Sequence, residues 1–315
     1  MVRRSVKFGL IFVWVVLAMA SPCAAKSLDL YPALSGFALR APDAPQSSRP
    51  TAFYAQTGPN PAWAVSQWNI AGPRLSSFTT GQEGEQTIYT ASAPAASVRI
   101  AENAAGADVT LQQNGAAVPC RTASGAPWES DLFLSSTSHA VGVIPGQPSG
   151  YLLSNLGALR EVVTISVAAA PSTPAKSCTV NMGGAVLAIV LQDYTAQPPQ
   201  TFFYQLHLNR YCGGQADGVC TTAWTRPLYY TRRNPYGCDD VLSRLGQPLL
   251  PNGTPRALDI DVLPGLRQAV ASAPGGMDRD LAHWSVSGGY IGLISWGDVA
   301  VTSHWHGYRL VAETN

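Results

Sequence analysis

Short apolar or alternating segments, separated by clusters of glycine, proline, asparagine and serine, recur along this 315-residue chain. Such segments are typical of short antiparallel strands. The 29 glycines and 24 prolines favour turns and leave little room for long helices. The pattern therefore predicts an all-β protein, an antiparallel β-sandwich or jelly roll with one short helix. The expected strands lie at residues 62–70, 86–91, 97–101, 108–112, 132–136, 161–168, 184–191, 202–208, 290–295 and 304–311.

One segment has the pattern of a helix. Asp261 and Pro264 are suited to its start, and a Pro-Gly-Gly sequence ends it soon after Ala271. Three apolar residues share one face at helical spacing: Leu263, Leu266 and Val270. We expect this helix to pack on the sandwich as a lid.

The stretch AAAPSTPAKS at residues 168–177 is the one candidate for a linker between two domains. It lies between two expected strands and directly precedes Cys178. We interpret it as a long hairpin loop, with a domain boundary near 168–178 as the alternative. On the favoured interpretation, residues 26–315 form a single β-sandwich domain.

The first 25 residues have the pattern of an export signal. Arg3, Arg4 and Lys7 precede an apolar run at residues 8–20, and small residues follow up to Ala25. The run is shorter than the roughly 20 residues that a membrane-spanning helix needs. We therefore expect cleavage after Ala25, a secreted product in the periplasm or outside the cell, and no membrane attachment after cleavage.

The charge balance argues against a nucleic-acid partner. Without residues 1–25 the chain holds 17 basic and 19 acidic residues, a net charge of −2. Charged residues make up only 12% of the sequence, so the surface is expected to be rich in neutral polar groups. Such a surface suits neutral polar partners such as sugars.

Five cysteines follow the leader, and an exported protein is expected to oxidise them. We predict a Cys120–Cys178 bridge and one further pair among Cys212, Cys220 and Cys238, with one thiol left over. No C-x-x-C pair occurs, which argues against cysteine ligation of a metal.

Aromatic residues gather near the two ends of the mature chain. Because terminal strands are often neighbours in jelly rolls, we expect the two groups to share one face. Indole and phenol rings offer flat apolar surfaces to the C–H groups of a sugar, and nearby amides can bind its hydroxyls. The alternative is that these rings fill the core. The candidate ligand-binding residues are Trp63, Trp68, Trp284, Tyr290, Trp296, Trp305 and Tyr308.

Two kinds of metal site are considered. His304 and His306 are two positions apart, so on a strand they lie on one face, where a third ligand such as Asp298, His283 or His207 is needed for zinc or copper. Acidic clusters in glycine-rich surroundings make calcium the possible cofactor. Those clusters are Asp239-Asp240, Asp259-Ile260-Asp261 and Asp278-Arg279-Asp280.

The sequence Trp128-Glu129-Ser130-Asp131-Leu132-Phe133 partially resembles the strand motif of jelly-roll β-glucanases and related retaining hydrolases, in which carboxylates alternate along one strand. The resemblance implies that Glu129 is a nucleophile and Asp131 a helper. The third carboxylate is missing, because the chain has Phe133 or Leu134 there. A proton donor would have to come from another strand, with Asp193, Asp259 or Asp261 as candidates.

Three functions remain open at this point. The favoured one is a secreted, lectin-like β-sandwich that binds a glycan or polysaccharide. The alternatives are a glycoside hydrolase or lyase on a jelly-roll scaffold, and a structural or adhesive surface protein. An enzyme needs at least two carboxylates that converge beside the rings, whereas a binding module needs only the ring-bearing surface. No complete catalytic motif occurs, which favours binding.

Overall fold

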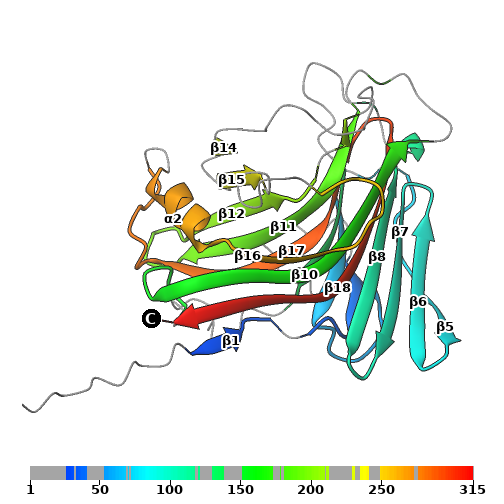
Figure 1. Ribbon diagram of the computed structural model, residues 1–315, viewed down its shortest axis with the longest axis horizontal. Coiled ribbons are helices and arrows are strands. Elements are labelled where there is room, and N and C mark those ends of the chain that lie inside the picture. The colour runs from blue at the N-terminus through cyan, green and yellow to red at the C-terminus, as the bar shows by residue number, and fades with distance from the viewer. Residues whose placement is uncertain are drawn as a thin grey trace, which may run out of the picture.

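The computed structural model describes a two-layered β-protein (Figure 1). The described residues are 26–31, 33–40, 53–68, 70, 72–117, 120, 130–137, 151–172, 178, 181–209, 211–212, 229–230, 235–240, 249–272 and 276–314. Two sheets of eight and ten strands account for most of them. The predicted β-sandwich is confirmed. The expected export signal lies outside the described residues.

The eight-stranded sheet holds the C-terminal strand near its middle. Its strand order is β16 (Arg256–Asp261), β10 (Leu156–Pro171), β18 (Val299–Thr314), β8 (Gly106–Asn114), β7 (Ala96–Asn103), β6 (Gln86–Ala93) and β5 (Thr79–Glu83). The short strand β1 (Ser27–Asp29) also pairs with β18, so the first and last described strands are neighbours (Figure 1).

The ten-stranded sheet follows the order β14 (Tyr229–Tyr230), β15 (Pro235–Asp240), β12 (Gln200–His207), β11 (Met182–Asp193), β17 (Trp284–Trp296), β9 (Ser130–Ser136), β4 (Trp63–Trp68), β2 (Phe37–Arg40) and β3 (Phe53–Gln56). Strand β13 (Tyr211–Cys212) also pairs with β11. Most pairs are antiparallel, but β12 with β15 and β2 with β4 are parallel.

From β8 to β11 consecutive strands alternate between the two sheets, and β16, β17 and β18 do the same. This alternation corrects one prediction. Residues 168–171 continue β10 in one sheet, and β11 begins in the other sheet, so the segment between them is not a hairpin. The chain crosses the sandwich there.

The predicted helix is confirmed as α2 (Leu263–Ala271), which lies beside the sheets (Figure 1). Its buried residues include Leu263, Leu266 and Val270, as the helical spacing predicted. The Asp261 carboxylate accepts hydrogen bonds from the amides of Leu263 and Leu159, each at 3.1 Å, so it links the start of the helix to β10. A single turn of 3-10 helix (Gly115–Ala117) follows β8. No helix among the described residues is both long and apolar enough to span a bilayer.

The inner faces of both sheets form one large hydrophobic core. Along β10, for example, Leu159, Val163 and Ile165 point into this core, because alternate residues of a strand face the same side. Each fully buried aliphatic side chain contributes about 1.5 to 3 kcal/mol to folding. Together these contributions offset the conformational entropy that the chain loses when it folds.

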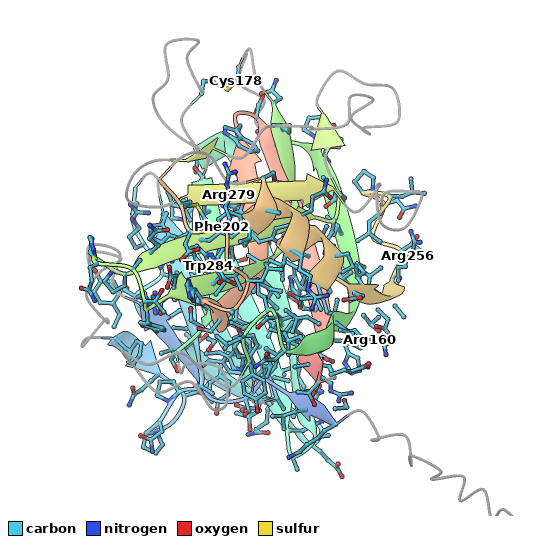
Figure 2. The ribbon with its side chains drawn as sticks, turned by 90° about the vertical axis from the view of Figure 1, so that its left-hand side faces the viewer. Arg160, Cys178, Phe202, Arg256, Arg279 and Trp284 are labelled. Atoms are coloured by element: carbon cyan, nitrogen blue, oxygen red, sulfur yellow. A yellow bond between two sulfur atoms is a disulfide. The ribbon has the colours of Figure 1, made fainter. Side chains whose placement is uncertain are left out.

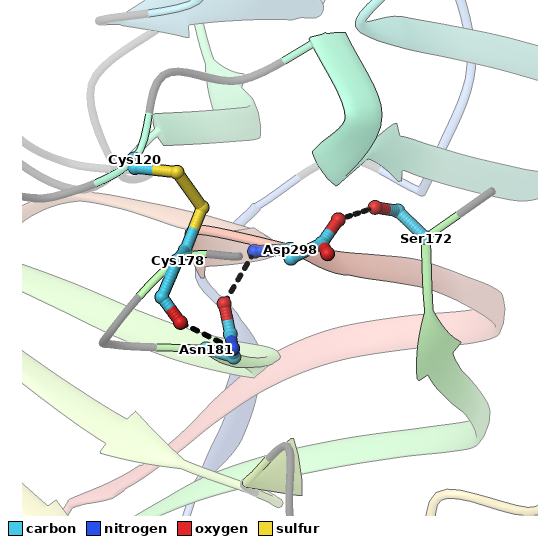
Figure 3. The surroundings of a disulfide bond; sticks show 5 residues. All are labelled: Cys120, Ser172, Cys178, Asn181 and Asp298. Atoms are coloured by element: carbon cyan, nitrogen blue, oxygen red, sulfur yellow. Dashed lines mark hydrogen bonds between the residues drawn. A yellow bond between two sulfur atoms is a disulfide. The ribbon is translucent and has the colours of Figure 1, made fainter. Parts of the chain in front are cut away.

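The predicted Cys120–Cys178 disulfide is present (Figure 3). The Cys178 carbonyl accepts a hydrogen bond from the Asn181 amide group at 2.9 Å, and the Asn181 side-chain oxygen accepts the backbone N–H of Asp298 at 2.8 Å. The Asp298 carboxylate in turn accepts a hydrogen bond from the Ser172 hydroxyl. The disulfide is therefore linked to the turn between β17 and β18. The side chains of Cys212, Cys220 and Cys238, among which a second bridge was predicted, lie outside the described residues.

Candidate functional site

A second apolar cluster covers the outer face of the ten-stranded sheet, the face that points away from the core. It comprises Phe133, Met182, Val186, Ala188, Tyr290, Ile294 and Trp296, with Trp68, Val190 and Phe203 packed against it at partial exposure. We call this surface the outer aromatic face. Strands β9, β11, β12 and β17 are thus apolar on both sides, because their other residues fill the core.

Three rings form a continuous row on the outer aromatic face. Phe133 stacks on Tyr290 with 4.5 Å between ring centroids, and Trp68 packs against Phe133 at 5.4 Å. Gly292 makes the row possible, since a Cβ atom at this position would lie 2.6 Å from the Phe133 ring. The Tyr290 hydroxyl accepts a hydrogen bond from the Gln205 side-chain amide at 2.6 Å. The row is therefore held by both packing and a buried polar contact.

Asp131 lies at the end of this row. It is directly opposite Trp68 in the antiparallel pair of β4 and β9, and directly opposite Ile294 in the pair of β9 and β17. Directly opposed residues share a face, so the carboxylate and the indole are neighbours on the outer aromatic face. Both side chains are half-buried, in contrast to the buried Phe133 and Tyr290.

Several predicted ligand-binding rings are core residues. Trp63, Trp284, Trp305 and Tyr308 are at most 2% exposed and belong to the cluster between the sheets. The prediction that they display a ring face to a ligand is wrong for this structure, because the two sheets cover them. The two terminal groups do meet, as expected: Trp63 packs edge-on against Tyr308, with ring centroids 5.8 Å apart. They meet inside the sandwich.

A bulge in β18 explains why Tyr308 points inward. Trp305 faces the core and His306 faces solvent, so strict alternation would turn residue 308 outward. The register between β10 and β18 shifts there, and Gly307 has a φ of 62°, which a residue with a side chain rarely adopts. The extra residue returns Tyr308 to the core. Period-two reading of the sequence cannot detect such a shift.

Tyr308 meets a buried acid that the sequence analysis missed. Glu161 on β10 is 1% exposed, and burial raises its pKa to about 8, with the Tyr308 hydroxyl opposing this shift only in part. Burial, followed by the Glu161 charge, raises the pKa of Tyr31 and Tyr308 well above the usual tyrosine value. The signal was present in the sequence: Glu161 occupies a core position in the alternating series Leu159, Glu161, Val163.

The predicted histidine pair does lie on one face, but without Asp298. His304 and His306 are exposed on the outer side of the eight-stranded sheet, where Thr110 and Asp108 on β8 are their respective hydrogen-bond partners. Asp298 is buried in the turn before β18, six residues from His304, or about 20 Å of extended strand. The prediction that Asp298 completes this site is therefore wrong. His207 lies on β12 of the other sheet.

The acidic clusters have separate environments. Asp259 forms an ion pair with Arg160 across β16 and β10, and Asp261 binds the amides at the start of α2. Neither lies on the sheet that carries Asp131, so neither is placed to act as its proton donor. The side chains of Asp239, Asp240 and Glu129 lie outside the described residues.

Two further predicted acids and one predicted histidine lie close together at the end of β11. Asp193, Asp278 and His283 each offer one ligand atom, and these atoms all lie within 4.8 Å of one another. Asp193 ends β11, and the other two belong to the segment between α2 and β17. The sequence analysis named all three residues but assigned them to different sites.

A scan against protein-family models and a search of curated protein sequences find no match to this chain. Among solved structures, the chain resembles endoglucanase 3 of Trichoderma harzianum, from family GH12, with a TM-score of 0.39 and 7% identity over 75% of this chain and 96% of that one. It also resembles the family 11 xylanase of Neocallimastix patriciarum, with a TM-score of 0.34 and 7% identity over 79% and 97% of the two chains.

A third structure is the endo-1,4-β-glucanase CelB2, with a TM-score of 0.35 and 14% identity over 75% of this chain and 96% of that one. All three TM-scores lie below 0.5. The function proposed below rests on this chain's own residues.

Proposed function

We propose that this protein binds a polysaccharide on the outer aromatic face. One observation carries the proposal: a half-buried indole, Trp68, and a half-buried carboxylate, Asp131, lie directly opposite each other on adjacent strands of that face. A sugar ring presents C–H groups on its flat sides and hydroxyls around its rim. An indole can stack on the former while a neighbouring carboxylate accepts hydrogen bonds from the latter.

The row of rings behind this pair supports the same proposal. Phe133 and Tyr290 continue the apolar surface from Trp68 towards β12, where Phe203 is also partly exposed. Phe133 and Tyr290 are themselves buried, so an elongated ligand would contact the partly exposed rings on either side of them, Trp68 on β4 and Phe203 on β12. The predicted export signal and the Cys120–Cys178 disulfide accord with a role outside the cytoplasm, where such polymers are met.

Cleavage of the same polymer is the second candidate function. The observation that favours it is the position of Asp131, which the resemblance to retaining hydrolases singles out and which lies beside the rings. In that resemblance Asp131 is the helper, and Glu129, two residues earlier in the chain, is the nucleophile. Retaining chemistry also needs a proton-donating carboxyl group about 5 to 5.5 Å from the nucleophile, and this group would come from another strand.

Affinity electrophoresis in gels that contain xylan, β-glucan or cellulose derivatives tests the binding proposal. We expect Trp68→Ala to weaken retention about tenfold, which corresponds to about 1.4 kcal/mol of binding free energy. Tyr54→Ala is the matched control, because Tyr54 is a ring 47% exposed on β3 of the same sheet and lies outside the outer aromatic face. Equal retention of wild type and Trp68→Ala on every polymer that wild type binds would refute the proposal, as would binding of none.

A reducing-sugar assay on the same preparations separates the two functions. If the protein cleaves the polymer, Asp131→Asn and Glu129→Gln should each abolish product release while leaving retention on the gel measurable. If the protein only binds, no preparation releases product, and Asp131→Asn lowers retention alone. Product release that persists unchanged in both variants would exclude these two carboxylates from catalysis.

A further inference from the structure

One carboxylate oxygen in the cluster of Asp193, Asp278 and His283 is buried without a hydrogen-bond partner among the described residues. Asp193 is 0% exposed. Its Oδ1 atom accepts hydrogen bonds from the Thr195 amide at 2.7 Å, the Thr195 hydroxyl at 2.6 Å and the Ala196 amide at 3.3 Å. Its Oδ2 atom is buried and has no hydrogen-bond partner among the described residues. A buried carboxylate oxygen without a partner is costly, so it calls for a cation or another donor.

The other two residues are held beside Asp193 by the local backbone. The Asp278 amide donates a hydrogen bond to the Gln200 side chain at 3.2 Å, and the Asp278 carbonyl accepts one from the Trp284 indole at 3.0 Å. Gln200 begins β12 and pairs with Asp193 across the turn from β11. Figure 2 looks onto this side of the molecule, with the neighbouring Arg279 and Trp284 labelled. Two strands and the loop before β17 thus bring the three side chains together.

His283 and Asp278 already interact with each other. The His283 Nδ1 atom lies 2.6 Å from the Asp278 carboxylate, and the Nε2 atom lies 3.9 Å from the Asp280 carboxylate. A hydrogen bond from the Asp280 amide and the contact with His283 lower the pKa of Asp278, and the same contact raises the pKa of His283. This pair satisfies its own two members but leaves Oδ2 of Asp193 unmatched.

We propose that Asp193, Asp278 and His283 bind a divalent metal ion of the zinc class, which ties the end of β11 to the loop before β17. The donor set is one imidazole with two carboxylates, whereas calcium prefers oxygen ligands alone. Donors around a tetrahedral zinc ion lie about 3.4 Å apart at ordinary bond lengths of about 2.1 Å. In the present structure the three ligand atoms lie within 4.8 Å of one another, and Asp278 and His283 are half-buried side chains that would rotate to reach the spacing around a bound ion.

The ion would act as a structural link. Asp193 lies at the end of a core strand, and His283 directly precedes Trp284, which is buried between the sheets and packs against Phe202 at 6.3 Å. Fixing both segments lowers the freedom of this end of the sandwich.

Calorimetric titration of the chelator-treated full chain tests this proposal, with Zn²⁺, Mn²⁺ and Ca²⁺ as probes. We expect one equivalent of Zn²⁺ to bind, a higher melting temperature with the ion bound, and much weaker binding of Ca²⁺. His283→Ala and Asp193→Asn should each weaken Zn²⁺ binding at least tenfold. Asparagine keeps the Oδ1 acceptor for Thr195 and Ala196, so this variant removes the charge and leaves the turn its hydrogen bonds.

The double variant His304→Ala/His306→Ala is the matched control, since it removes the exposed histidines of the other sheet. It should bind Zn²⁺ like wild type. Absence of Zn²⁺ binding to wild type, unchanged binding in His283→Ala, or loss of binding in the double variant would each overturn the proposal. Circular dichroism checks that each variant is folded, and if Asp193→Asn is not, His283→Ala in its loop decides the result alone.

Discussion

The outer faces of the two sheets are built in opposite ways. On the eight-stranded sheet, outward residues form exposed polar pairs across strands: Thr110 with His304, Asp108 with His306, and Arg160 with Asp259. On the ten-stranded sheet, the outward residues are mostly apolar and aromatic, and most are buried. One sheet therefore has a single buried face, whereas the central strands of the other are buried on both.

This difference indicates where the protein meets a ligand. A polar outer face is satisfied by water, so its pairs add little to stability or binding. Most rings of the ten-stranded sheet's outer face are already buried, and its partly exposed side chains, Trp68, Asp131, Val190 and Phe203, are the ones that a ligand can still remove from water. The predictions below test whether the two faces differ in energy as they differ in composition.

The largest expected effect is the loss of a ring from the outer aromatic face. Phe133→Ala removes a 4%-exposed side chain that contacts both Trp68 and Tyr290. It should lower the free energy of unfolding by about 3 to 5 kcal/mol, as for rings deleted from a core. Urea denaturation followed by fluorescence measures this change.

His306→Ala on the eight-stranded sheet is the comparison for that experiment. The imidazole is exposed, so its loss should change the free energy of unfolding by less than about 0.5 kcal/mol. Similar losses in the two variants would contradict the contrast between the faces.

The next effect concerns Glu161, which points into the core from the eight-stranded sheet. Glu161 keeps its proton in the folded protein up to about pH 8, whereas the unfolded chain releases it near pH 4.5. Unfolding therefore releases a proton between these values, so stability should fall by about 1.4 kcal/mol per pH unit as the pH rises through this window, and then level off. Denaturant midpoints between pH 5 and pH 9 measure the slope.

Glu161→Gln removes this titration and serves as its control. The difference in unfolding free energy between wild type and the variant should change with pH in favour of the variant as pH rises. A difference that stays constant from pH 5 to pH 9 would show that Glu161 does not hold the proton.

The smallest effect is expected at the adjacent residue. Arg160 points outward and forms ion pairs with Asp259 and Glu313. Because the three side chains are between about a third and a half exposed, Arg160→Ala should have only a small effect on stability, and that effect should shrink further in 1 M salt. Thermal unfolding in low and high salt measures the size of this effect and its salt dependence. A loss of stability as large as that of Phe133→Ala would contradict the expectation.

Most of the strands could be predicted from the sequence, and the exceptions have physical reasons. The ten expected strand segments all fall on observed strands, namely β4, β6–β12, β17 and β18. Apolar residues alternate clearly along these strands. The prediction missed six strands of two to six residues each: β1, β2, β3, β13, β14 and β15. It also missed β5, whose residues are all exposed, and β16, where Asp259 and Asp261 suggested a metal cluster. Both lie at the edges of the eight-stranded sheet, where packing imposes little pattern.

The candidate site could be predicted only in part. Three of the expected ligand-binding rings share the outer aromatic face: Trp68, Tyr290 and Trp296. The sequence analysis grouped them with four rings that fill the core, Trp63, Trp284, Trp305 and Tyr308, and it selected Asp131 separately, through the resemblance to hydrolases. A ring in the core and a ring on the outer aromatic face can both have polar neighbours in the sequence, so alternation alone does not distinguish them. It considered Phe133 only as the position of a missing carboxylate, and it assigned no role to Glu161.

The sequence by itself determined the two-sheet β architecture and helix α2, because period-two alternation, helical spacing and turn residues are local properties of the chain. The Cys120–Cys178 pairing was also predicted, although it joins residues 58 apart. Only the tertiary structure decided which side of each doubly apolar strand faces the core, that the Gly307 bulge turns Tyr308 onto Glu161, and that Asp193, Asp278 and His283 meet. These outcomes depend on register and on contacts between distant strands, and a one-residue shift in register exchanges the two faces of a strand.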